Sequence, residues 1–174
     1  MTTPTLSTKR LRLRPLQQAD ETVVFAMMSD DETMRFWDWP AFGDRETVSE
    51  IVAGQIADVR SGDAVYWTVE LSGGTPIGVC DLSDFDTHHR RAEIGFLFSR
   101  EHWGKGYAAE AVTKIIAHAF GPYGLERLWA RFHAGNAASR KLLQSLSFTH
   151  EGTLKGHVLR EGERRDCEIW GRLR

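Results

Sequence analysis

The stretch with the clearest chemical capacity is Gly104-Lys105-Gly106, which stands directly ahead of an uninterrupted helix-forming run, YAAEAVTKIIAHAF. Backbone N–H groups at a helix N-terminus lack intrahelical partners and carry partial positive charge, which suits a phosphate or pyrophosphate. Glycines let the backbone approach such an anion without a Cβ in the way, and Lys105 adds positive charge. The alternative is that both glycines only form a tight strand-to-helix turn.

Two familiar phosphate-binding loops do not explain this stretch. A Walker A loop requires Ser or Thr after Gly-Lys, but Gly106 follows Lys105. Gly104, Gly106 and Ala109 match the G-x-G-x-x-A pattern of a dinucleotide-binding fold. Five residues separate this pattern from the preceding strand, however, and too little chain follows it for a doubly wound sheet. We therefore expect an anion-binding helix start of another kind.

The elements that must position this loop follow from the apolar pattern. Alternating or continuous apolar runs predict strands at residues 10–16, 64–71, 76–85, 92–98, 127–133, 147–159 and 164–173. Helical spacing predicts helices at residues 21–29, 45–60, about 106–120 and 136–146. Asp20 and Asp44 are the expected caps of the first two helices, and residues 30–44 form an aromatic-rich connection. The order predicts one mixed α/β domain over residues 1–174.

Composition narrows the class of protein. The 174 residues are 41% hydrophobic and 26% charged, as in a soluble globular protein. A formal charge of −2 and a pI near 6.4 give no electrostatic footprint for nucleic acid. Cys80 and Cys167 cannot form a disulfide framework, and neither lies in a metal-ligand cluster. No leader or membrane-length apolar run is present, so we expect a protein of the reducing cytoplasm without membrane contact.

Two segments, AEIGFLFSREHWGKGYAAEAV and NAASRKLLQSLSFTHEG, resemble the GNAT N-acetyltransferase superfamily, most closely its RimJ/RimL-type branch. The resemblance runs from LRLRPL to DCEIWGRL, which is nearly the whole chain. It implies a mixed, mostly antiparallel sheet with a parallel strand–helix–strand unit splayed around acetyl-CoA. It also implies an acyl-CoA-dependent N-acetyltransferase that transfers the acetyl group directly and without a metal, and it leaves room for a homodimer.

The resemblance assigns a set of cofactor-binding residues: Phe98, Trp103, Gly104, Lys105, Gly106, Tyr107, Ala108, Ala109, Asn136 and Ser139. The superfamily loop pattern is Gln/Arg-x-x-Gly-x-Gly/Ala, and here Trp103 replaces its first residue. Asn136 corresponds to the asparagine that binds the pantetheine arm, although capping of the following helix also accounts for it. Many relatives use a tyrosine to protonate the leaving thiolate. Leu143 stands at that position, and the branch offers Ser139 instead.

The sequence offers one carboxylate for the acceptor amine. Glu93 lies in the strand before the glycine loop and is the expected base or substrate-positioning residue, unless it faces solvent or pairs with Arg91. His133 ends the next strand, where a structural role is at least as good an explanation as proton acceptance. RimL-type enzymes carry a glutamate in the closing hairpin, but the aligned residue here is Val158.

The weakness of this base predicts the kind of acceptor. At pH 7 a lysine amine is neutral in on the order of one molecule in a thousand, whereas an α-amine is neutral in about a tenth of molecules. We therefore expect a protein or peptide N-terminal α-amine as the acceptor. The alternatives are a small-molecule amine (an antibiotic or a polyamine) and a non-catalytic acyl-CoA-binding module. Four aromatic residues form either a core plug or an acceptor-side wall: Phe36, Trp37, Trp39 and Phe42.

Overall fold

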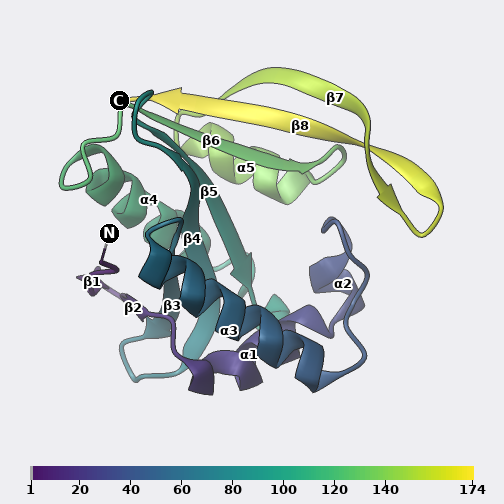
Figure 1. Ribbon diagram of the computed structural model, residues 1–174, viewed down its shortest axis with the longest axis horizontal. Helices are drawn as coiled ribbons and strands as arrows, with labels where there is room; N and C mark the ends of the chain where they lie inside the picture. Colours follow the sequence, from purple (N-terminus) through teal and green to yellow (C-terminus); the bar gives the residue numbers. More distant parts are fainter. Residues whose placement is uncertain (1) are drawn as a thin grey trace.

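The computed structural model describes residues 2–174 and shows one twisted sheet with helices on both faces (Figure 1). In this part of the chain, eight strands pair in the order β1-β2-β3-β4-β5-β6-β8-β7. Their bounds are Leu6–Ser7, Leu11–Pro15, Val65–Leu71, Pro76–Asp86, Arg91–Phe98, Arg127–His133, Thr149–Arg160 and Glu163–Leu173 for β1 to β8. Neighbouring strands run antiparallel except β5 and β6, which are parallel. The predicted mixed, mostly antiparallel fold is confirmed.

The four predicted helices are confirmed to within a residue or two at each end, and a short one is added. Their bounds are α1 Glu21–Met28, α2 Asp31–Met34, α3 Arg45–Ser61, α4 Tyr107–Phe120 and α5 Ala137–Ser145, with 3-10 turns at Gln18–Asp20 and Arg100–His102. Helix α2 lies inside the segment predicted as a connection. It forms because the Asp30 carboxylate accepts a hydrogen bond from the Thr33 N–H at 2.8 Å.

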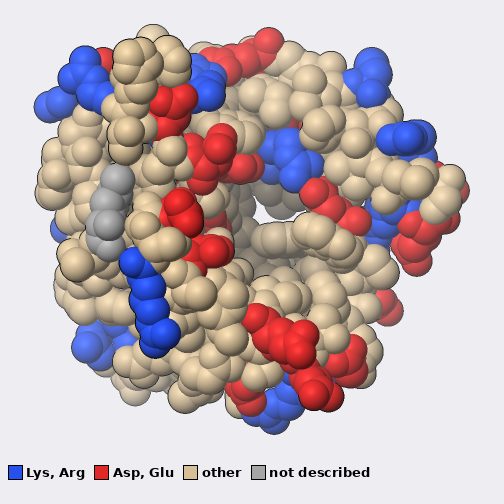
Figure 2. Space-filling view, in the orientation of Figure 1, with Lys and Arg blue, Asp and Glu red and all other residues tan. Residues whose placement is uncertain are grey.

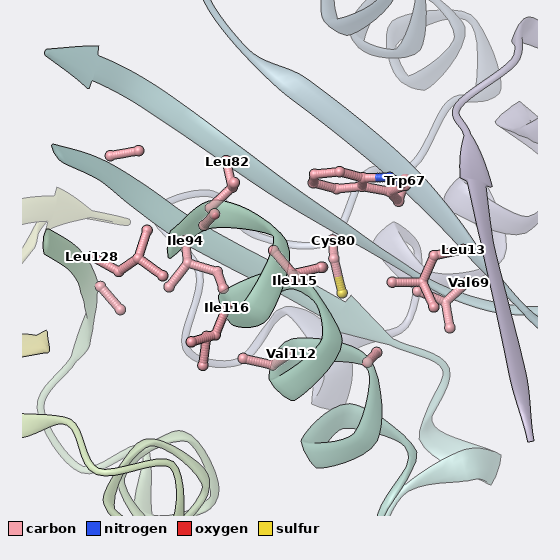
Figure 3. Close-up of a cluster of buried hydrophobic side chains, with 14 of the residues drawn as sticks. Leu13, Trp67, Val69, Cys80, Leu82, Ile94, Val112, Ile115, Ile116 and Leu128 are labelled. Carbon is pink, nitrogen blue, oxygen red and sulfur yellow. The ribbon is translucent and has the colours of Figure 1, made fainter. Parts of the chain in front are cut away.

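Two apolar clusters hold the helices against the two faces of the sheet. On one face, Val112, Ile115 and Ile116 of α4 pack against strand residues such as Leu82 and Ile94 (Figure 3). On the other face, α1 and α3 pack against Val79 and Leu97. We call these the α4 face and the α3 face. Because side chains alternate along a strand, each residue of β4, β5 and β6 can be assigned to one of the two faces.

The parallel pair β5–β6 is short. Residues Arg91, Ala92 and Glu93 pair with Arg127, Leu128 and Trp129, and the pairing ends there, although both strands continue. Beyond this point β5 stays paired with β4, and β6 stays paired with β8. The two halves of the sheet therefore separate, and Figure 1 shows β6, β7 and β8 turning away from β3, β4 and β5. The sheet opens directly after Glu93.

The predicted cap at Asp44 is confirmed, but the predicted cap at Asp20 is wrong. Asp44 accepts from the Thr47 N–H at 2.7 Å. Asp20 makes no side-chain hydrogen bond to the start of α1. Its buried carboxylate instead binds the Arg14 guanidinium through two bonds of 2.7 and 2.6 Å and the Thr68 hydroxyl at 2.7 Å. These partners, Arg14 six residues earlier and Thr68 on β3, replace the cap because they compensate a carboxylate that the fold has buried.

This difference predicts unequal losses of stability. Asp20→Asn removes the charge from a buried pair and should lower the free energy of unfolding by about 3 kcal/mol. Asp44→Asn alters an exposed cap to a residue that also caps well, and should have a much smaller effect. Urea denaturation followed by circular dichroism measures both. Equal losses in the two variants would contradict the assignment of Asp20 to the core network.

Candidate active site

A cavity of about 260 Å³ occupies the opening between β5 and β6. Figure 2 shows the molecule hollowed in this region, with acidic side chains along one side of the hollow. Residues of both sheet faces line the cavity: Phe36, Trp37, Asp38, Trp39, Asp81, Ser83, Glu93, Ile94, Gly95, Phe96, Ala130, Arg131, Phe132, Asn136, Ser139 and Leu143. The cavity therefore connects the α4 face with the α3 face through the sheet.

The glycine loop gives α4 an open N-terminus. Gly104 and Gly106 have φ of +73° and +77°, a backbone region that favours glycine. Gly106 is the N-cap and supplies no side-chain hydrogen bond, whereas Asn136 caps α5 with its side chain. Within residues 2–174, the N–H groups of Tyr107, Ala108 and Ala109 find no acceptor. A Cβ at Gly104 would meet no atom within 4 Å. This open cradle suits a phosphate group.

Arg10 makes the first turn of α4 compatible with an anion. Glu110 lies in that turn, where an uncompensated negative charge would repel a phosphate. The Arg10 Nε donates to the Glu110 carboxylate at 2.6 Å, and its Nη1 donates to the Lys105 carbonyl at 3.0 Å. Its guanidinium also lies 4.5 Å from the centre of the Tyr107 ring. Sequence reasoning did not assign Arg10 to the loop, because the contact spans about a hundred residues.

Trp103 and Phe98 connect the glycine loop to the end of β5. The Trp103 indole N–H donates to the Phe98 carbonyl at 2.7 Å and so ties the loop to the end of β5. The Phe98 side chain is only 6% exposed and belongs to the core on the α4 face. Phe98 thus binds the loop through its carbonyl, while its ring packs in the core on the α4 face. The Lys105 side chain is exposed at the rim.

Helix α5 presents three of its residues to the cavity. Asn136 caps the helix by accepting the Ser139 N–H at 3.0 Å. Its amide nitrogen and the Ser139 hydroxyl have no hydrogen-bond partner among the residues that the structure describes. Leu143 lies one turn beyond Ser139 and is fully buried. Ser139 therefore supplies the hydroxyl group on the part of α5 that lines the cavity.

Glu93 lies in the last residue pair before the strands separate, on the α3 face. It lines the cavity and forms no ion pair with Arg91, which instead lies near Asp86. Burial raises the pKa of Glu93 to about 7, and the negative charge of Asp81 adds to this effect against the opposing charge of Arg131. A carboxylate with this pKa accepts a proton readily at neutral pH.

Asp81 is a cavity residue that sequence reasoning missed. It lies on β4 opposite Gly95 of β5, and its carboxylate rests on that glycine. A Cβ at Gly95 would lie 2.3 Å from the Asp81 Oδ1. An isolated glycine inside a strand often marks such a close approach. Gly95 was therefore the available signal, but it did not identify which side chain approaches.

The aromatic segment between α2 and α3 divides between the two predicted roles. Phe36, Trp37 and Trp39 line the cavity, and Trp39 is 61% exposed. Trp37 and Phe42 also pack against the core cluster on the α3 face. The segment is thus a wall of the cavity at its centre and part of the core at its end.

Charged groups from the other half of the sheet hold this segment in place. The Arg131 guanidinium donates to Asp38 at 2.7 Å, and the His133 Nε2 lies 2.9 Å from the same carboxylate. Although burial acts to raise it, these contacts hold the pKa of Asp38 below its ordinary value. His133 is buried and does not line the cavity, so it has a structural position. Val158 lies outside the cavity lining as well.

Residues 2–174 hold neither a metal-ligand cluster nor a helix suited to crossing a membrane. No three His, Cys, Asp or Glu side chains of this part of the chain come together as a metal-ligand set. None of its helices combines the length and apolar character that a membrane crossing requires. The cavity lining offers the carboxylate, hydroxyl and amide groups described above.

Known proteins share both the sequence and the fold. Residues 10–149 match the family described as Acetyltransferase (GNAT) domain. The uncharacterized N-acetyltransferase p20 of Bacillus licheniformis is 34% identical over 98% of this chain and 96% of its own length. The spermidine N(1)-acetyltransferase of Escherichia coli K12 is 26% identical over 92% of this chain and 84% of its own.

A solved structure reproduces the fold described here. The apo crystal form of RimL, a ribosomal alpha-N-protein acetyltransferase, superimposes with a TM-score of 0.89 at 18% identity, over 100% of this chain and 96% of that one. At this identity the likeness concerns the fold. The chain belongs to the GNAT family of acetyltransferases, which take their acetyl group from acetyl-CoA.

Proposed function

We propose that this enzyme acetylates the N-terminal α-amine of a protein or peptide, with Glu93 and Ser139 as its catalytic residues. The observation that carries the proposal is the cavity through the sheet. It brings Glu93 on the α3 face into one space with Asn136 and Ser139 of α5 on the α4 face. A donor entering from one face and an acceptor entering from the other meet at the point where β5 and β6 separate.

On the α4 face, the residues suit a CoA thioester. The unpaired N–H groups at residues 104–109 would hold its pyrophosphate, and Arg10 neutralises Glu110 beside them. The free amide nitrogen of Asn136 would donate to the pantetheine arm while its oxygen caps α5. When bound, acetyl-CoA supplies the acetyl group as a reactive thioester.

The two catalytic residues would move one proton each. As the amine nitrogen forms its bond to the acetyl carbonyl carbon, Glu93 takes the proton that the nitrogen loses. As the carbon–sulfur bond breaks, the Ser139 hydroxyl gives its proton to the sulfur and regains one from water. The products are the neutral amide and the free thiol. Leu143 leaves α5 without a tyrosine for this second role, which favours Ser139.

A base with a pKa of about 7 matches an α-amine better than a lysine side chain. The RimL structure bears the name of an alpha-N-protein acetyltransferase, which agrees with this acceptor. A small-molecule polyamine is the second candidate, because the spermidine enzyme is a relative over most of the chain. The unpaired carboxylates of Glu93 and Asp81 favour a cationic acceptor in either case.

The proposed anion-binding role of the glycine loop predicts a loss of CoA binding when Gly106 is replaced. Gly106→Val places a side chain in the anion cradle and should weaken CoA binding at least about tenfold, measured by isothermal titration calorimetry. Gly62→Val is the matched control, since Gly62 ends α3 with a similar positive φ of +89°. It should lose comparable stability and keep its affinity for CoA. Equal CoA affinity in both folded variants would show that Gly106 only forms a turn.

A second prediction tests the proposed acid. Ser139→Ala should lower kcat by about a hundredfold while the Kd for acetyl-CoA changes by less than about threefold. Ser145→Ala provides the control on the same helix, because the Ser145 hydroxyl is exposed and donates only to the Leu142 carbonyl. Free thiol release measures turnover. If Ser139→Ala turns over as fast as the wild type, Ser139 has no proton-transfer role.

The third prediction concerns acceptor and pH. At pH 7, kcat/KM for a peptide with a free N-terminus should exceed that for an N-blocked peptide with one internal lysine by at least about tenfold. Glu93 with a pKa of about 7 gains its basic form as pH rises, so kcat/KM should rise through pH 7. Glu93→Gln should lower kcat/KM moderately and remove the inflection near pH 7. Preferential acetylation of the internal lysine would refute the assignment of an α-amine acceptor.

A further inference from the structure

Asp81 has an unusual electrostatic position. Its carboxylate lies inside the cavity on the α3 face, pressed against Gly95. Within residues 2–174 its hydrogen-bond partner is the Ser83 hydroxyl at 3.1 Å, and no Lys, Arg or His side chain of this part of the chain forms an ion pair with it. The nearby cation, Arg131, is bound to Asp38 at 2.7 Å. Asp81 is therefore a carboxylate without a counter-charge.

The fold retains this charge at a cost. Burial raises the pKa of Asp81 to about 6, so the group is still largely ionised at neutral pH. Asp81 is half-buried in the cavity, and a carboxylate in such a position without a partner lowers the stability of the folded state. Gly95 lacks the side chain that would displace the carboxylate from the cavity. An uncompensated charge that lies in a substrate cavity points to a positively charged ligand.

Asp81 and Glu93 lie on the same face of the sheet, on the adjacent strands β4 and β5. Asp81 pairs with Gly95 and Ser83 pairs with Glu93, so the two carboxylates are diagonal neighbours on one face. Diagonal neighbours on adjacent strands lie about 7 Å apart. Glu93 is on the strand that borders the opening, and Asp81 is one strand farther from it. A group bound to Asp81 would lie one strand farther from the opening than a group bound to Glu93.

We propose that Asp81 binds a second positive charge of the acceptor, a few bonds from the amine that Glu93 serves. The reacting amine loses its charge when it becomes an amide, so it cannot compensate Asp81 through the reaction. A second ammonium or guanidinium group keeps its charge from binding to product release. This inference rests on the proposed active site. The shared chemistry is a dicationic amine, either a basic residue beside a peptide N-terminus or a linear diamine.

Matched acceptors test the proposal. The two pairs are 1,4-diaminobutane with butylamine, and a peptide with lysine at its second position with the same peptide carrying norleucine there. In the wild type, kcat/KM for the dication of at least one pair should exceed that for its monocation by at least about tenfold. Asp81→Asn should reduce that ratio to about threefold or less. Because the charge of Asp81 also raises the pKa of Glu93, the variant changes the rate for both members of a pair, and the ratio between them is the readout.

Two further measurements separate a binding role from a structural one. Isothermal titration of the diamine into the enzyme with CoA should show binding in the wild type that Asp81→Asn loses. Thermal unfolding of Asp81→Asn should occur at the wild-type temperature or above it, because the variant removes an uncompensated charge. The control is Asp84→Asn, since Asp84 is exposed on the same strand and lies outside the cavity lining. It should retain the preference for dications.

The outcomes are distinct. Equal rates for dication and monocation in both wild-type pairs, or a preference that persists in Asp81→Asn, would overturn the proposal. So would an equal loss of activity toward both members of a pair, which would show a structural role. A preference for the diamine alone supports Asp81 and identifies a small-molecule acceptor. Calorimetric binding of the diamine that depends on Asp81, without acetylation of any amine, supports the cation site and contradicts the proposed function.

Discussion

The end of the β5–β6 pairing after Glu93 is the constraint on which the rest of the site depends. A continuous sheet separates its two faces, because its backbone groups pair and its side chains close the gaps. Here β5 stays paired with β4, and β6 stays paired with β8, while the facing edges of β5 and β6 separate. The opening places residues of the α3 face and the α4 face in one cavity. Two substrates can then approach each other without sharing an entrance.

The charges on the two sides of this opening are arranged differently. On the α4 face, Glu110 is neutralised by Arg10, which leaves the helix start positive for an anion. On the α3 face, Glu93 and Asp81 lack such partners, and burial raises the pKa of both carboxylates. The positive charge of Arg131 opposes this rise at Glu93 only in part, and Arg131 forms its ion pair with Asp38. The protein thus offers positive potential to the donor and negative potential to the acceptor.

Local patterns predicted seven of the eight strands in residues 2–174, helices α1, α3, α4 and α5, and the cap at Asp44, because each depends on neighbours in the sequence. The two-residue strand β1 at Leu6–Ser7 was missed. Glu93 was selected because it lies in the strand before the glycine loop, and its side chain lines the cavity. The failures concern contacts that the local pattern does not encode. Asp20 has the residue type of a cap, yet its carboxylate binds Arg14, six residues earlier, and Thr68 on β3. Asp81 has no local signature, since what distinguishes it is a missing counter-charge.

The aromatic segment between α2 and α3, which lines the cavity, is held in place by residues far away in the sequence. Arg160, at the tip of the β7–β8 hairpin, is only 8% exposed. Its Nη1 donates to the carbonyls of Met34, Arg35 and Trp37 at 2.8, 2.9 and 3.1 Å. These bonds satisfy backbone groups at the end of α2 and compensate a buried guanidinium. Because Asp38 is bound to β6, the wall segment is fixed from two strands of the half that turns away. The width of the acceptor side is therefore set by the same separation of the sheet that creates the cavity.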